Sequence, residues 1–273
     1  MGFAIIYHEV LCYGGKKMSE LYNEKFSIEK IIDYALKIPG VRINREDFLR
    51  KELSKFFCKD TVEKAIQTNP AQAGIIVKKI NKIANGCIGF ETTKVTAISA
   101  ATGIPGGVAL FATIPTDIIQ YFSHVFIVLQ KLAYLYGWAD FTSKDGNELN
   151  DETKTYLMLF LAVMVGVNTA GPIVDKAAQI AIAKAQKKIA EKVVIKETQF
   201  FTTAASKVTT TVAKKAFADE VSKSIPLIGA VASGGLTLVS FLPMAQRLKK
   251  HLETLPLADV NTYKNTDGKP FIP

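Results

Sequence analysis

The first part of the chain has the hydrophobic pattern of amphipathic α-helices, with apolar residues three or four positions apart. Four segments show this spacing: residues 27–38, 45–57, 60–67 and 71–88. Asn44 predicts an N-cap for the second helix, and residues 39–40 and 69–70 predict turns. Gly86 and Gly89 predict that the fourth helix weakens near its end. We expect these helices to pack one side on a core and to expose basic outer faces.

Three later stretches contain no Asp, Glu, Lys or Arg: residues 95–116, 155–174 and 225–246. Each is about as long as the roughly 20 residues that cross a bilayer, although glycine or proline interrupts each one. We expect them to be central helices surrounded by protein, and insertion into lipid stays open as the alternative. No stretch shows the sustained alternation of a β-strand. The predicted fold class is therefore all-α, a single large helical domain with Gly/Pro-broken apolar central helices and amphipathic outer helices.

The pattern predicts three regions along the chain. Residues 1–26 form an N-terminal extension, of which residues 1–17 are interpreted as a disordered arm or a tag-like remnant. No basic segment precedes its short apolar run, so no signal peptide is predicted. Residues 27–255 form the helical domain. The polar C-terminal tail, residues 256–273, is predicted to be extended or disordered.

The candidate site is a polar stripe on the long apolar helix predicted within residues 103–138. Polar residues recur there every seven positions, and at 100° per residue this spacing keeps them on one narrow side of a helix. The stripe comprises Asp117, Gln120, His124, Lys131 and Tyr134. Such a stripe is costly to bury without hydrogen-bond partners. Asn168 and Asp175, again seven apart on a following helix, are the residues predicted to face it.

The stripe has two interpretations. In the first it is a satisfied interhelical polar network that anchors the core. In the second, Asp117, His124 and Lys131 line an interhelical pocket of a hydrolase-like enzyme. An i, i+7 pair spans about 10 Å and does not match a metal-binding HExxH motif, so no metal is predicted. The GIPGG segment lacks the phosphate-binding pattern GxxxxGK[ST], and no cofactor is predicted.

The net charge of +9 predicts an acidic partner. The helix expected after Pro172 carries a row of lysines that would contact anionic lipid, with an ordinary solvated face as the alternative. These lipid-contact candidates are Lys184, Lys187, Lys188, Lys192 and Lys196. Nucleic acid is not expected as a partner, because no recognised motif or interleaved exposed aromatic residues accompany the lysines. The chain has three widely spaced cysteines without a CxxC pair, which favours a reducing cytoplasm.

Several segments resemble the EcsC family of bacterial proteins, and the segment QKLAYLYGW is the most specific of them. The resemblance covers roughly residues 27–255. It is carried by residues 31–57 (IIDYALKIPGVRINREDFLRKELSKFF), 103–138 (GIPGGVALFATIPTDIIQYFSHVFIVLQKLAYLYGW), 149–168 (LNDETKTYLMLFLAVMVGVN) and 224–252 (SIPLIGAVASGGLTLVSFLPMAQRLKKHL). The family is named after a member encoded beside an ABC exporter, and it has no established activity. The resemblance therefore implies a cytoplasmic or membrane-associated helical protein and supplies no catalytic residues.

Together these features predict a non-enzymatic accessory or interaction protein, cytoplasmic and peripheral to the inner face of the membrane. Its expected partner is an anionic membrane surface or a membrane protein such as a transporter. Two alternatives stay open: the hydrolase-like enzyme, and a protein that inserts its apolar helices into membranes.

Overall fold

The computed structural model describes the backbone of residues 12–13, 16–17, 28–102, 116–140, 151–191 and 234–264, and side chains within residues 28–97, 119–140, 154–183 and 240–264. This part of the chain contains α3 (Ile28–Ala35), α4 (Arg45–Leu53), α5 (Lys59–Gln67), α6 (Val77–Thr102), α7 (Thr116–Leu135), α8 (Asp151–Val165), α9 (Ala170–Glu191) and α12 (Gly234–Leu252). Two short 3-10 helices follow, η1 (Pro256–Ala258) and η2 (Val260–Tyr263). Near the N-terminus, β1 (Cys12–Tyr13) pairs antiparallel with β2 (Lys16–Lys17). The helices pack into one body, and the predicted all-α class is confirmed.

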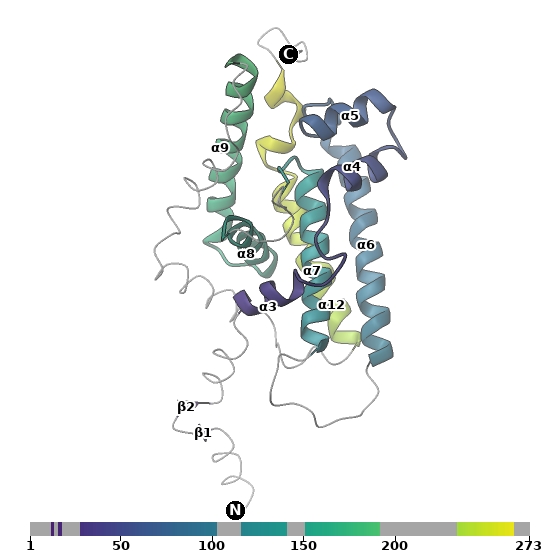
Figure 1. Cartoon of the computed structure of the whole chain (residues 1–273), viewed down its shortest axis with the longest axis vertical. Helices are drawn as coiled ribbons and strands as arrows, with labels where there is room; N and C mark the ends of the chain where they lie inside the picture. The colour runs from purple at the N-terminus through teal and green to yellow at the C-terminus, as the bar shows by residue number, and fades with distance from the viewer. Residues whose placement is uncertain are drawn as a thin grey trace, which may run out of the picture.

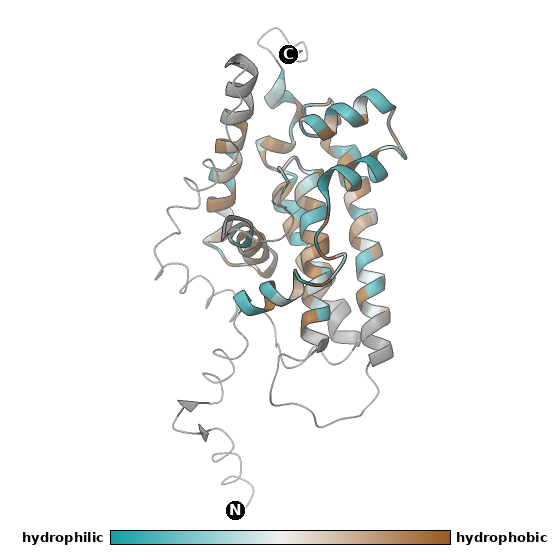
Figure 2. Cartoon of the chain, viewed as in Figure 1, coloured by the Kyte–Doolittle hydropathy of each residue, from teal (hydrophilic) through white to brown (hydrophobic). Residues whose placement is uncertain are grey.

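The core is organised around α7, which contacts α3, α4, α6, α8 and α12. Helices α6, α7 and α12 lie side by side, with α8 and α9 on the opposite flank from α6 (Figure 1). Phe122, Phe126 and Leu129 of α7 are fully buried. Figure 2 shows hydrophobic residues along α7 and α8 and hydrophilic residues on α4 and α5. This distribution is the expected one of apolar central helices and amphipathic outer helices.

The part of the second charge-free stretch that belongs to α8 lies largely inside the protein. The side chains of α8 from Tyr156 to Met164 are buried, except for a partly exposed Met158. Trp138 packs against this helix, with its ring centroid 4.9 Å from that of Phe160. The prediction of a helix surrounded by protein is confirmed for this segment. Among the described residues, no helix is both long enough and apolar enough to cross a membrane.

A buried arginine fixes the segments around α4 and α5. The Arg45 guanidinium is buried and donates hydrogen bonds only to backbone carbonyls, at 2.7–3.3 Å. The acceptors are the carbonyls of Ala65, Ile66, Thr68 and Trp138. Because carbonyls at helix ends lack intrahelical partners, one side chain here satisfies the end of α5 and the segment after α7 together.

The helix predicted over residues 71–88 begins later than expected, and the weakening predicted at Gly86 and Gly89 does not interrupt it. Residues 71–76 form a turn in which the Gln72 amide donates to Asn69 Oδ1 at 2.8 Å and Gly74 has φ +90°. Helix α6 then continues to Thr102, through Gly86 and Gly89. Burial of one helix face against α7 and α12 offsets the cost of the two glycines, which is about 1 kcal/mol each.

The prediction of an extended or disordered tail is wrong for residues 256–264. Leu257 and Tyr263 are buried, and the Tyr263 hydroxyl accepts from Asn69 Nδ2 at 3.0 Å and donates to the Leu257 carbonyl at 3.3 Å. Although this segment is mostly polar, its few apolar side chains hold it on the protein, because they pack against elements that are distant in the sequence. Residues 265–273 lie outside the described part of the chain, as do the GIPGG segment and residues 225–233.

Gly137, in the segment QKLAYLYGW, lies where the docked C-terminal segment approaches α7. Its φ is +98°, and a Cβ atom at this position would lie 2.9 Å from the carbonyl oxygen of Leu257. A side chain would therefore meet both backbone strain and a steric clash. Glycine is required here by the tertiary contact as well as by the turn.

We expect Gly137→Ala to lower the free energy of unfolding by at least about 2 kcal/mol, measured by urea denaturation. Gly40→Ala is the matched control, because Gly40 has φ +84° but open space around a Cβ atom. That variant should lose only about 1 kcal/mol, from strain alone. Equal losses in the two variants would contradict the steric role of Leu257.

Candidate functional site

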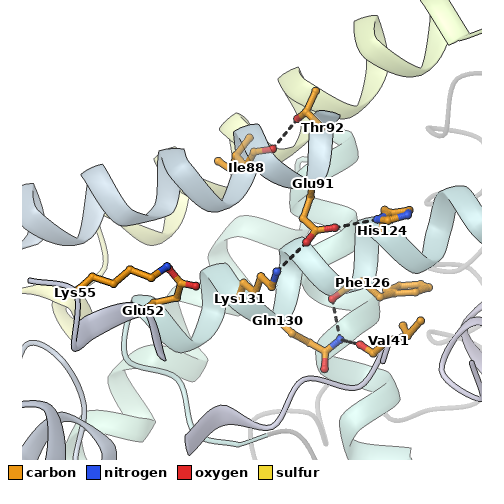
Figure 3. A network of polar contacts seen from close by, with 10 residues as sticks. All are labelled: Val41, Glu52, Lys55, Ile88, Glu91, Thr92, His124, Phe126, Gln130 and Lys131. Atoms are coloured by element: carbon orange, nitrogen blue, oxygen red, sulfur yellow. Dashed lines mark hydrogen bonds and ion pairs between the residues drawn. The ribbon is translucent and has the colours of Figure 1, made fainter. Parts of the chain in front are cut away.

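A buried carboxylate, Glu91, lies between α6 and α7 and joins two members of the predicted stripe (Figure 3). Glu91 is 1% exposed. Its Oε2 lies 2.9 Å from His124 Nδ1, and its Oε1 accepts a hydrogen bond from Lys131 Nζ at 2.8 Å. His124 and Lys131 are two helical turns apart on α7, so each reaches a different oxygen of the same carboxylate. We call these three residues the Glu91 cluster.

The Glu91 cluster keeps a buried negative charge stable. Burial by itself raises the pKa of Glu91, because the charged form loses contact with water. Hydrogen bonds from His124 and Lys131, with the positive charge of Lys131, outweigh burial and hold the pKa of Glu91 below its ordinary value. A carboxylate only accepts hydrogen bonds, so we infer that His124 Nδ1 carries the proton in this contact.

Two aromatic rings complete the surroundings of Lys131. Its ammonium lies 6.0 Å from the ring centroid of Phe48 and 5.8 Å from that of Phe90. Lys94, four residues after Phe90 on α6, also lies over the Phe90 ring, with its Nζ 4.5 Å from the ring centroid. These distances are within the range of cation–π attraction. Phe90 is 57% exposed, so it forms the outer boundary of the cluster towards solvent.

Cys87 lies one helical turn before Glu91 and is not a nucleophile in this setting. Burial raises the pKa of its thiol to about 11, and the charge of Glu52 adds to this effect. The thiol is therefore protonated at neutral pH, whereas the thiolate is the reactive form.

Gln130, next to Lys131, has a structural role. The side chain is buried, and its Nε2 donates to the carbonyls of Val41 and Phe126 at 2.9 and 2.8 Å. Its Oε1 accepts from the Ile43 amide at 3.0 Å. This side chain fixes the loop between α3 and α4 against the middle of α7 (Figure 3).

The other predicted stripe residues do not join the Glu91 cluster through any contact seen here. Tyr134 is buried and its hydroxyl donates to Asp140 Oδ1 at 3.1 Å. Gln120 is partly buried on α7, and the side chain of Asp117 lies outside the described residues. The predicted residues share one side of α7 by their helical spacing, but among them the structure shows only His124 and Lys131 with a common partner.

The residues predicted to face the stripe lie elsewhere. Asn168 is exposed in the turn between α8 and α9. Asp175 of α9 lies 3.0 Å from His251 Nε2 of α12, at ion-pair distance and without hydrogen-bond geometry. Glu91, which does face the stripe, was missed. Its signal was its register, since it follows the buried Ala84 and Ile88 at helical spacing.

The predicted lipid-contact lysines fall largely beyond what the structure describes. Three of them belong to α9, where the structure describes the backbone but not these side chains: Lys184, Lys187 and Lys188. Two lie outside the described residues altogether: Lys192 and Lys196.

The described residues offer little catalytic chemistry around His124. Ser123 Oγ donates to the Ile119 carbonyl at 2.7 Å and so does not pair with the imidazole. Within the same part of the chain, no group of three or more His, Cys, Asp or Glu side chains is placed to hold a metal ion. The hydrolase hypothesis stays a prediction, and the observed contacts are those of a paired polar network.

The chain matches no protein-family model, no curated protein and no solved structure. The resemblance to the EcsC family therefore stays a prediction.

We expect Glu91→Gln to lower the free energy of unfolding by about 2 kcal/mol at neutral pH, because Lys131 loses its counter-ion while partly buried. The depressed pKa of Glu91 means that the ion pair stabilises the fold fully above the ordinary value of 4.5. That contribution is lost as the pH falls through the lower folded-state pKa. The stability gap between the parent protein and the variant should therefore shrink on acidification.

Urea denaturation of both proteins at a series of pH values from neutral to strongly acidic measures this gap. Glu46→Gln is the control, because Glu46 forms an exposed ion pair with Arg50 on α4. It should change stability by less than about 0.5 kcal/mol. A gap for Glu91→Gln that is constant with pH would contradict an ionised Glu91.

Proposed function

We propose that the protein is a non-catalytic accessory protein that docks on an anionic membrane surface through the outer side of α6. The supporting observation is the one-sided charge of this helix. Four lysines of α6 are exposed: Lys78, Lys79, Lys82 and Lys94. The single acidic residue between positions 71 and 102 is Glu91, which is turned inward and neutralised by the Glu91 cluster.

The lysines of α6 form no ion pair with another described side chain, whereas basic residues on α4 and in the turn after it do. Arg50 pairs with Glu46 and Glu63, and Lys55 pairs with Glu52. Paired charges cancel at a distance, and unpaired ones of the same sign add. The exposed side of α6 therefore carries positive charge without an exposed carboxylate of its own helix, whereas acidic residues are interspersed with the basic ones on α4 and α5. Near an anionic membrane each lysine contributes about 1 kcal/mol, and salt screens this contribution.

Exposed apolar side chains favour lipid over nucleic acid as the anionic partner. Ile76, which directly precedes α6, is 47% exposed, and Phe90, between Lys82 and Lys94, is 57% exposed. A mixture of cationic and apolar side chains is typical of surfaces that enter the interface between lipid headgroups and acyl chains. A location at the inner face of the membrane belongs to this proposal, and the EcsC resemblance, which implies a cytoplasmic or membrane-associated protein, is compatible with it. The lysines of α9 would add to the same attraction.

Flotation with phosphatidylcholine vesicles of increasing phosphatidylglycerol content tests the proposal. We expect binding that rises with the anionic lipid and falls with salt. Neutralising the lysines of α6 together (K78Q, K79Q, K82Q and K94Q) should weaken binding by up to about 4 kcal/mol. These side chains are exposed, so the variant should keep its stability.

The matched control removes the same charge from α4, α5 and the turn between them, with K51Q, K55Q, K59Q and K64Q. This variant should lose much less binding. Equal losses in the two variants would show that only net charge matters, and would overturn the assignment to α6. Binding that resists high salt would favour insertion of apolar helices, and binding to nucleic acid but not to vesicles would overturn the membrane proposal.

A further inference from the structure

We propose that Phe90 is an apolar anchor of this docking surface and that its ring enters the membrane interface beside Lys94. The inference rests on the proposed function and adds a mode of binding to it. It predicts that attachment has two parts, an electrostatic one from the lysines and an apolar one from this ring.

The ring of Phe90 is exposed and does not fold back onto its own helix. Phe90 is 57% exposed, on a helix whose other face is packed on α7 and α12. Helical side chains lean towards the preceding turn, which places Gly86 beneath Phe90. A Cβ atom built at Gly86 would meet nothing within 4 Å, the Phe90 side chain included. The ring therefore stands clear of its own helix instead of folding onto it.

No exposed negative charge of α6 lies beside the ring. The adjacent residue, Glu91, points into the protein and is bound by His124 and Lys131. Lys94 Nζ lies 4.5 Å from the ring centroid. A lipid phosphate that approaches the ring meets this ammonium and no exposed α6 carboxylate. Contact of the Lys94 ammonium with lipid headgroups therefore promotes entry of the ring into the membrane interface, and entry of the ring promotes that contact.

Burial of the ring favours attachment. An exposed phenyl ring gains free energy in proportion to the apolar area removed from water, and partial burial at a headgroup boundary gives a part of this gain. Lys94 keeps its charge at the headgroup level while its apolar stem follows the ring. One ring is too little to hold the protein on a neutral membrane, so the anchor acts only after the lysines have brought the helix to the surface.

Fluorescence of Phe90→Trp tests the proposal directly. The parent protein has one tryptophan, Trp138, which is 2% exposed and supplies a constant background. With vesicles that contain phosphatidylglycerol, we expect the added emission to shift to shorter wavelength and to be quenched by lipids brominated on the acyl chains. Tyr34→Trp is the matched control, because Tyr34 is 52% exposed on α3 with Lys37 Nζ 5.8 Å from its ring centroid. Its emission should not respond.

Removal of the ring gives an independent measure. We expect Phe90→Ala to weaken partitioning onto anionic vesicles roughly tenfold and Phe90→Leu to keep most of it, with the salt dependence of binding unchanged in both. If the parent protein floats through the lysines of α6 but Phe90→Trp shows neither shift nor quenching, the anchor is overturned and the docking function stands. If the parent protein does not float at all, both proposals are overturned.

Discussion

The arrangement of the central helices depends on the burial of one negative charge. Taking a carboxylate out of water costs several kcal/mol unless cations and hydrogen bonds replace the lost hydration. Glu91 of α6 meets this requirement with two donors from α7, one for each oxygen. A shift of α6 along α7 by one turn would leave the charge without at least one of them. The cluster therefore fixes the register of the two helices, and α12 packs across both.

The irregular segments are held in place by a similar requirement, which here applies to uncharged backbone groups. Buried backbone carbonyls and amides need partners, and loops cannot supply all of them internally. Arg45 donates four hydrogen bonds around the end of α5 and Trp138, and Gln130 forms two with the backbone of Val41 and Ile43. These two long side chains hold the N-terminal helices against α7. In the described part of the chain, α6 packs on α7 and α12, and its lysines are exposed.

The position of Glu91 thus affects both the interior and the proposed docking surface. A carboxylate that faces inward stabilises the contact between α6 and α7, and the same carboxylate is thereby removed from the outer face. The electrostatic potential at that face is then set by its lysines. Phe90 lies between the two regions, because its ring is near both Lys131 of the cluster and Lys94 of the outer face.

The sequence by itself determined the features that depend on neighbours within a few turns. The all-α class, the Asn44 cap, whose Oδ1 accepts from the Asp47 amide at 2.9 Å, and the common side of His124 and Lys131 were all readable from local spacing. Only the tertiary structure decided which carboxylate faces that side, how far α6 continues, and that residues 256–264 are folded. Each of these rests on contacts between distant positions, such as Asn69 with Tyr263, 194 residues apart. Local periodicity shows which side of a helix is polar, but the partner on that side is chosen by how the helices pack.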